Sequence, residues 1–155
     1  MMMTILTIWM MSNFYGLTEA KLFAKLQETY FTDLIKPEGI HEPFDAYSES
    51  KKAIIELKCR GAHYNQMLIE KVKWDKLALL RASQGLGTLY ICSTPLGCYM
   101  WDLGVVIEPD WSEKRLPKTT EFKSVEWVSK WVGYLDIADA QAIQIGLGVS
   151  LRNSN

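Results

Sequence analysis

KAIIELKC, residues 52–59, is the stretch of sequence that decides the fold, because it is the clearest strand in the chain. Successive side chains of a strand point to opposite faces, and these eight residues separate into an apolar face and a mixed face. The apolar face carries Ala53, Ile55, Leu57 and Cys59, and the mixed face carries Lys52, Ile54, Glu56 and Lys58. Glu56 and Lys58 are therefore predicted to project together, away from Ile55 and Leu57, with Cα atoms about 6 to 7 Å apart.

Helices and further strands are predicted on both sides of this segment. One helix is expected at residues 18–32 with Thr18 as its N-cap, and another at residues 70–82, stopped by Gly85 and Gly87. Short strands are expected at residues 44–47, 67–69, 88–93 and 98–103.

The remainder of the chain is less regular. Residues 108–123 are polar and hold two prolines, so they are predicted to form a loop. Residues 127–135 are rich in aromatic side chains and fit either a helix or a strand. The order of elements is satisfied by a mixed central β-sheet flanked by helices, which is an α/β domain of the layered type.

Composition limits the possible classes of function. The chain has 155 residues, 48% of them hydrophobic and 23% charged, as expected for one folded domain. A net charge of −1 excludes a uniformly basic surface. Three cysteines without C-x-x-C spacing and only two histidines argue against a zinc cluster, so we expect reduced cysteines and a cytoplasmic protein. The glycine pairs at 85–87 and 146–148 lack the other glycines of a dinucleotide loop, and no organic cofactor is predicted.

The ends of the chain are predicted to lie outside the single domain at residues 12–146. Residues 1–11, MMMTILTIWMM, are apolar but too short to span a bilayer, so no membrane insertion is expected. No basic residue precedes them and no small-residue cleavage site follows. They form either a dispensable extension, with the functional chain beginning near Met11, or an extra element that packs at a subunit interface. Residues 147–155 are predicted to be a tail.

Asp45, Glu56 and Lys58 are the residues that indicate chemistry. If the strands at 44–47 and 52–59 pair antiparallel around the turn at 48–50, Asp45 lies beside Glu56. Two adjacent carboxylates repel each other unless a cation lies between them, and a hard divalent ion such as Mg²⁺ suits their oxygens. Lys58 then orients a water or stabilises phosphate charge. A solvated ion pair on an edge strand is the alternative interpretation.

Glu19 is a third acidic candidate, in the first turn of the predicted helix. Leu22, Phe23, Leu26 and Tyr30 follow it at helical spacing, which places Glu19 toward the core side. The alternative is an acid that complements the helix dipole and contributes a few tenths of a kcal/mol.

These residues resemble the pattern of the PD-(D/E)XK nuclease superfamily. The resemblance rests on Phe44-Asp45, on Glu56-Leu57-Lys58 in a hydrophobic strand, and on a preceding helix that carries Glu19. The resemblance extends from Thr18 to Leu135. Over this range the chain is similar to small phage-encoded nucleases, which are akin to Holliday-junction resolvases and intron-encoded endonucleases. The chain departs from the pattern at one point, because the proline stands one step early, at Pro43. The resemblance implies a restriction-endonuclease-like core and, for a phage-encoded protein, a location in the host cytoplasm.

The resemblance also implies a mechanism, the metal-assisted hydrolysis of a DNA phosphodiester. Asp45 and Glu56 would bind one or two Mg²⁺ ions, or Mn²⁺, together with the main-chain carbonyl of Leu57. Lys58 would position or help to deprotonate the attacking water, and Glu19 would complete the water shell of the metal. The catalytic set is thus Glu19, Asp45, Glu56 and Lys58.

The charge distribution indicates where DNA would lie. Residues 51–81 carry eight basic and three acidic side chains, a net charge of +5, which leaves −6 on the remainder. The predicted phosphate contacts are Lys51, Lys52, Arg60, Lys71, Lys73 and Lys76. The lysines of the helix at 70–82 have a simpler interpretation as a solvated face. A non-catalytic nucleic-acid-binding accessory protein that keeps the nuclease fold is the alternative function.

The aromatic residues raise the question of self-association. Trp101, Trp127 and Trp131 are predicted to belong to the core or to a subunit interface rather than to base-stacking platforms. Six tryptophans and seven methionines in a small chain suggest excess apolar surface, so a homodimer is the hypothesis. His63 and Tyr64, between two predicted strands, either touch DNA or simply lie on the surface.

Overall fold

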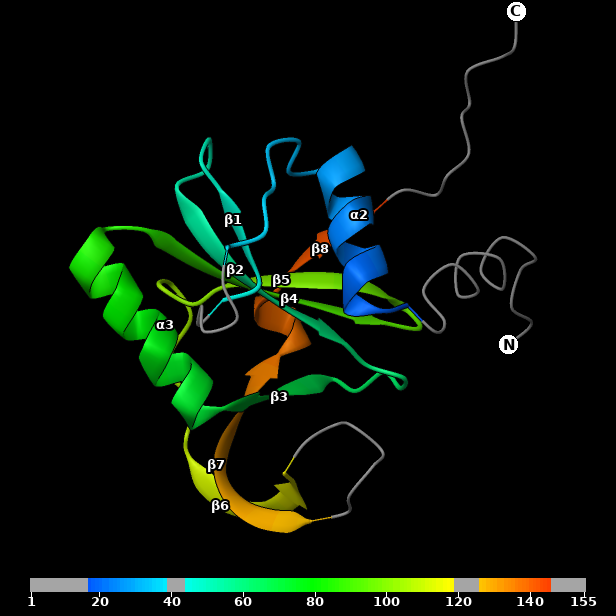
Figure 1. Ribbon diagram of the computed structural model, residues 1–155. Coiled ribbons are helices and arrows are strands. Elements are labelled where there is room, and N and C mark those ends of the chain that lie inside the picture. The colour runs from blue at the N-terminus through cyan, green and yellow to red at the C-terminus, as the bar shows by residue number, and fades with distance from the viewer. Residues whose placement is uncertain (1–16, 39–43, 119–125, 146–155) are drawn as a thin grey trace, which may run out of the picture.

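The computed structural model describes residues 17–38, 44–118 and 126–145, and Figure 1 shows their arrangement. The helices are α2 (Glu19–Thr29), α3 (Lys71–Gln84) and the 3₁₀ helix η1 (Ile137–Asp139). The strands are β1 (Ala46–Ser48), β2 (Ala53–Cys59), β3 (Gln66–Glu70), β4 (Gly87–Thr94), β5 (Gly97–Asp102), β6 (Ser112–Pro117), β7 (Trp127–Asp136) and β8 (Gln141–Ile143). Both predicted terminal segments, residues 1–11 and 147–155, lie outside the described residues.

The central sheet has five strands in the order β1-β2-β4-β5-β8. The central pair, β2 and β4, is parallel, with Ile54 opposite Thr88, and the other neighbours are antiparallel. The segment between β2 and β4, which contains β3 and α3, returns the chain to the end of the sheet at which β2 begins, so β2 and β4 run parallel. The predicted α/β fold with a mixed central sheet and flanking helices is therefore confirmed.

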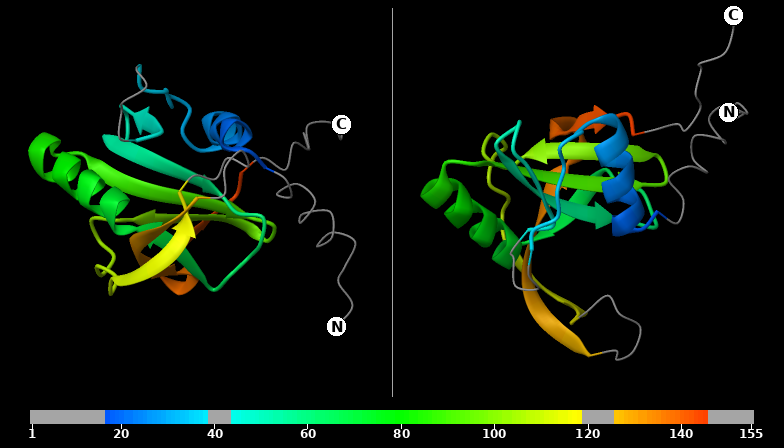
Figure 2. Two further views of the ribbon diagram at one scale, coloured as in Figure 1. Left: turned by 60° about the horizontal axis from the view of Figure 1, so that its bottom comes forward. Right: turned by 45° about the horizontal axis from the view of Figure 1, so that its top comes forward.

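Each face of β2 packs against a different helix, as its alternation predicts. Ile55 and Leu57 lie in one buried cluster with Leu22 and Leu26 of α2. Ile54 lies in the second buried cluster, which includes Trp74, Leu77, Tyr90 and Trp101. Figure 2 shows α2 and α3 on either side of the sheet. Burial of a large apolar side chain stabilises a fold by about 1.5 to 3 kcal/mol, so these two clusters hold the layers together.

A second sheet, of three strands in the order β3-β7-β6, was not predicted. The segment expected to be a loop, residues 108–123, contains β6, and that prediction was wrong. Its strand depends on pairing with β7, as in Lys114 opposite Lys130, and such a distant partner is invisible to local sequence patterns. The ambiguous segment at 127–135 is a strand. In Figure 1 the β6–β7 hairpin curves away below the central sheet.

The helix ends mostly agree with their sequence signals. The Thr18 hydroxyl accepts a hydrogen bond from the Lys21 N–H at 3.2 Å, as expected of an N-cap. The helix α2 ends at Thr29 rather than Thr32, because the N–H of Phe31 donates to the Leu26 carbonyl and turns the chain. Gly85 ends α3 in the left-handed conformation, with φ of +65°.

Gly133 permits a close approach between β7 and the segment after β5. A Cβ atom at this position would lie 2.5 Å from the Pro109 Cβ and 3.0 Å from the Trp111 ring. Trp111 in turn packs edge to face against Trp74, near the start of α3, with ring centroids 5.9 Å apart. The absence of a side chain at Gly133 therefore allows the 109–111 segment to reach α3. No helix in the described part of the chain is long and apolar enough to cross a membrane.

Candidate active site

Asp45 and Glu56 lie side by side, as the predicted hairpin required. The register pairs Ala46 with Ile55, and the Asp45 N–H donates to the Ile55 carbonyl at 3.0 Å, which carries the pairing one residue further. Because β1 begins at Ala46, β2 has no paired strand on that side from Leu57 onward. The Asp45 Oδ2 takes the place of a strand partner and accepts a hydrogen bond from the Leu57 N–H at 2.8 Å.

Glu56 is a buried carboxylate whose negative charge is only partly compensated by neighbouring cations. Its side chain is only 4% exposed, and Oε1 lies 3.2 Å from the Lys73 Nζ. Its Oε2 is buried and has no hydrogen-bond partner among the described residues. Burial and the nearby charge of Asp45 raise the pKa of Glu56 to about 7, although Lys73 and Lys58 oppose the shift. This carboxyl group therefore needs a positive charge in order to ionise fully at neutral pH.

Lys58 and Glu19 complete the group that the sequence predicted. Lys58 lies on the same face of β2 as Glu56, and both line the cleft described below. The positive charge of Lys58 favours ionisation of both Glu56 and Glu19. Although residue Glu19 is largely exposed, partial desolvation of its carboxyl group and the charge of Asp45 raise its pKa. Glu19 is thus electrostatically coupled to Asp45 from the first turn of α2. The structure brings all four predicted catalytic residues into one region.

The donor atoms fit a hard divalent cation. The carboxylate of Asp45, just before β1, and that of Glu56 on β2, whose Oε2 is buried, offer oxygen atoms, which Mg²⁺ prefers over nitrogen or sulfur. Within the described ranges, no group of three or more His, Cys, Asp or Glu side chains surrounds one point. A divalent cation here would therefore have Asp45 and Glu56 as its carboxylate ligands, and its remaining ligands would be main-chain oxygen or water.

A cleft of about 640 Å³ opens over Glu56 and Lys58. One wall comes from β2, β3 and α3, and the other comes from the β6–β7 hairpin. Five cationic side chains line it: Lys58, Arg60, Lys73, Lys118 and Lys130. Among the residues that the structure describes, two acids, Glu56 and Glu70, share the lining, and Glu70 Oε1 lies 2.7 Å from the Lys130 Nζ. The cleft is therefore net positive, which suits a polyanion.

The predicted phosphate contacts divide into three groups. Arg60 and Lys73 line the cleft. Lys71 and Lys76 lie on α3, where Lys71 is ion-paired with Asp75 at 2.7 Å and Lys76 is exposed. Lys51 and Lys52 lie at the other end of β2, where the Lys52 ammonium is held by Glu49 at 2.5 Å.

Sequence reasoning missed the contribution of the hairpin. Lys118 and Lys130 line the cleft but lie far from Glu56 in the chain. In the structure, exposed and half-buried side chains alternate over residues 127–131 of β7, and Lys130 lies on the half-buried face. The ion pair of Lys73 with Glu56 was also missed, because Lys73 was assigned to DNA contact alone.

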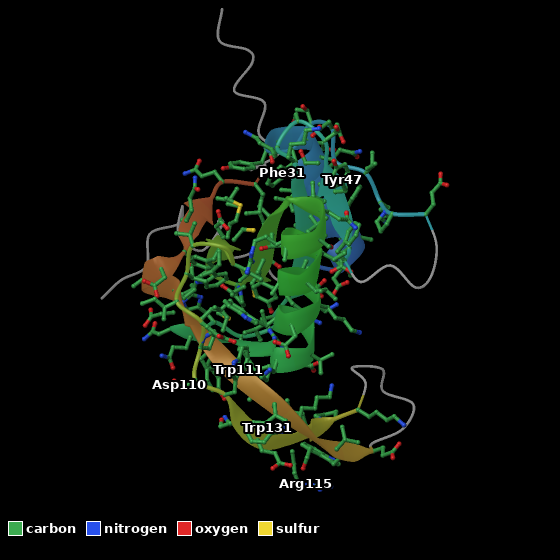
Figure 3. All side chains as sticks on the ribbon, turned by 90° about the vertical axis from the view of Figure 1, so that its left-hand side faces the viewer. Phe31, Tyr47, Asp110, Trp111, Arg115 and Trp131 are labelled. Carbon is green, nitrogen blue, oxygen red and sulfur yellow. The ribbon has the colours of Figure 1, made fainter. Side chains whose placement is uncertain are left out.

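The three tryptophans have different environments. Trp101 is fully buried, as predicted for a core residue. Trp127 and Trp131 are 50% and 53% exposed, so they do not belong to the core. Figure 3 shows Trp131 and Arg115 on the hairpin, at the end of the molecule opposite Phe31 and Tyr47.

Comparison with known proteins finds a distant similarity to solved structures and none to known sequences. No protein-family model and no curated protein sequence matches the chain. Among solved structures, the chain is similar to Hjc, a Holliday junction resolvase from the archaeal hyperthermophile Archaeoglobus fulgidus. The two share 16% sequence identity over 77% of this chain and 86% of that one, with a TM-score of 0.47.

Proposed function

We propose that this protein is an Mg²⁺-dependent endonuclease that hydrolyses phosphodiester bonds in DNA. The observation that carries the proposal is the pair Asp45 and Glu56, with a buried and unpartnered Oε2, at the base of a cationic cleft. A buried carboxylate with these neighbours is destabilising unless a cation joins it. A divalent ion relieves that cost and is needed for the chemistry.

Each residue has a separate role in this proposal. Asp45 and Glu56 would hold one or two Mg²⁺ ions together with the Leu57 carbonyl, and Mn²⁺ could substitute. Glu19 would bind a water of the metal. When bound, the metal lowers the pKa of a water and offsets negative charge on the phosphoryl oxygens. Lys58 orients the attacking water, and its ammonium charge stabilises the hydroxide that remains when this water gives its proton to solvent.

The cationic lining of the cleft positions the DNA backbone. Arg60 and Lys73 lie beside the carboxylate pair, and Lys118 and Lys130 face them from the hairpin. Phosphate contacts of this kind set position and orientation and carry no sequence information. Lys51, Lys52, Lys71 and Lys76 remain proposed contacts of the outer duplex.

The alternative is a nucleic-acid-binding accessory protein without turnover. Duplex, single-stranded and four-way-junction DNA would be incubated with the protein in Mg²⁺ or in EDTA. Wild type is expected to cleave at least one substrate in Mg²⁺ only, and Glu56→Ala and Lys58→Ala are expected to lose that activity. Glu49→Ala, which removes a carboxylate outside the cleft, is the matched control. Cleavage that persists in EDTA or in Glu56→Ala would overturn the assignment, and binding without cleavage would support the accessory role.

The proposal includes a homodimer in the cytoplasm. Trp127 and Trp131 are each at least half exposed, and both lie at alternate positions on one face of β7. Two such aromatic side chains on one face suit a self-complementary contact. The cytoplasmic location stays a proposal, and the cysteines Cys59, Cys92 and Cys98 are free in the structure.

A further inference from the structure

A second pocket, of about 700 Å³, adjoins the proposed active-site cleft. Arg60 and Leu68 line both cavities and form the boundary between them. Beyond this boundary the second pocket is lined by Tyr64, Asn65, Gln66, Tyr134 and Asp136, together with Met67. None of these residues takes part in the proposed chemistry.

The two cavities lie along one face of the three-stranded sheet. The register pairs Gln66 with Asp136 and Leu68 with Tyr134, and alternate positions of a strand share a face. Continuing in the same alternation, Glu70 of β3 and Lys130 of β7 line the active-site cleft. A ligand strand that lies in the cleft can therefore continue directly into the second pocket.

The side chains of the second pocket suit a neutral aromatic ligand better than a phosphate. Tyr64 is 62% exposed and offers a ring face to a planar group. The hydroxyl of Tyr134 is held by Lys114, which fixes that ring as a wall. Asn65, Gln66 and Asp136 offer hydrogen-bonding groups, and the carboxylate of Asp136 would repel a phosphate.

Arg60 lies between the cationic active-site cleft and the second pocket. One of its guanidinium nitrogens donates to the Leu68 carbonyl at 3.1 Å, which holds the side chain at the boundary. The Tyr90 hydroxyl donates to the same carbonyl at 3.2 Å and supports this arrangement from the buried side. The positive charge of Arg60 therefore faces a site where a backbone phosphate can sit between the cleft and the pocket.

We propose that the second pocket binds an unpaired nucleobase of the nucleic acid whose backbone lies in the active-site cleft. The inference rests on the proposed function, since the cleft is taken to hold the phosphodiester. The base stacks on Tyr64, its edge meets the amide and carboxylate groups, and Arg60 contacts the adjoining phosphate. A base that is paired and stacked within a duplex cannot enter such a pocket. The substrate class is therefore DNA with an unpaired nucleotide next to the cleaved bond.

The test uses binding in EDTA, so that its outcome does not depend on cleavage. The probes are a single strand and a duplex with one bulged nucleotide, each carrying 2-aminopurine at the unpaired position, and a fully paired duplex. Wild type is expected to quench 2-aminopurine in the first two probes by stacking. Tyr64→Ala is expected to lose the quenching and to bind these probes about tenfold more weakly, a typical effect of losing one base-stacking contact.

Two matched variants complete the test. Tyr64→Phe keeps the ring and is expected to bind and quench as wild type does. Ile107→Ala removes an apolar side chain that is 92% exposed outside both cavities and is expected to change nothing. Equal binding and quenching by Tyr64→Ala and wild type, or no quenching by wild type, would overturn the inference. Quenching without cleavage in Mg²⁺ would retain the base pocket and reject the nuclease assignment, so the two failures are distinguishable.

Discussion

Lys73 Nζ lies 3.2 Å from Glu56 Oε1, and this contact joins α3 to the central strand of the proposed active site. The lysine is 31% exposed whereas the glutamate is 4% exposed, so the cation reaches inward to a carboxylate that water scarcely touches. The other oxygen of Glu56 is buried, and no residue in the described part of the chain forms a hydrogen bond with it. One lysine therefore compensates the charge of Glu56 only in part, and the stability of the metal-free protein should depend on pH.

The metal-free protein is expected to lose stability as the pH rises from about 4.5 to about 7. The pKa of Glu56 is about 7 in the folded state, against an ordinary value of 4.5, so in this window the folded state keeps a proton that the unfolded state releases. Ionisation then costs the folded state up to about 3 kcal/mol. Glu56→Gln should remove this pH dependence and stabilise the protein at pH 8, as measured by urea unfolding in EDTA at pH 5 and pH 8. A wild-type free energy of unfolding that stays constant across this range would contradict the expectation.

Added Mg²⁺ is expected to stabilise wild type at pH 8 more than it stabilises Asp45→Asn. A ligand that binds only the folded state raises its stability by about 2.7 kcal/mol at one hundred times its Kd. The asparagine side chain can still accept the hydrogen bond from the Leu57 N–H, so this variant removes charge while keeping the local structure. Thermal unfolding with and without Mg²⁺ measures the difference. Equal shifts in melting temperature for both proteins would argue against Asp45 as a ligand.

Asp45→Ala should destabilise the protein in a way that Asp45→Asn does not. Alanine leaves the Leu57 N–H without its partner, and an unsatisfied buried donor costs about 1 to 3 kcal/mol. Both variants should cleave DNA at least about 100-fold more slowly than wild type. Changing a residue that only supports a metal ligand already costs up to about 100-fold in activity, and changing the ligand itself should cost at least as much. Urea unfolding beside the cleavage assay separates the two effects. The structural role would be wrong if both variants unfolded at the same urea concentration.

Lys118→Gln and Lys130→Gln are each expected to weaken DNA binding and to reduce its dependence on salt. Each lysine that contacts a phosphate contributes about one unit to the slope of log K against log salt concentration. Lys36→Gln is the comparison, because Lys36 is exposed, does not line the cleft and lies over the Phe23 ring. Fluorescence anisotropy in a salt series measures the slopes. A larger loss for Lys36→Gln than for the hairpin lysines would place the DNA elsewhere.

Trp131→Glu is expected to convert the proposed homodimer into a monomer. A charge at this half-exposed position would have to be buried in the contact, which is strongly unfavourable. Light scattering gives the mass of both proteins, and circular dichroism checks that the variant is folded. A monomeric wild type would remove the hypothesis.

Strands β1, β2, β4 and β5 of the central sheet and the core of the site could be predicted because their signals are local, whereas β8 of the same sheet was missed. The alternation in residues 52–59 sets which side chains of β2 face each core, and Asp45 follows from one short hairpin. These features depend on residues close together in the chain, where strand periodicity and turn geometry apply.

The second sheet could not be predicted because its strands pair across long separations. β3 and β7 are about 65 residues apart, as Leu68 opposite Tyr134 shows, and β6 is polar enough to resemble a loop. The cleft wall with Lys118 and Lys130 depends on this pairing. The burial of Glu56 and its contact with Lys73 likewise arise only when α3 packs on the sheet.

Gly133 links the hairpin to the proposed catalytic centre over several contacts. Any side chain there would displace Pro109 and Trp111, and Trp111 packs on Trp74, the residue that follows Lys73 on α3. A mutation at Gly133 could therefore reduce turnover although it lies outside the reaction site, by misplacing the lysine that faces Glu56. Screens for inactive variants should find position 133 among residues that a list of metal ligands would omit.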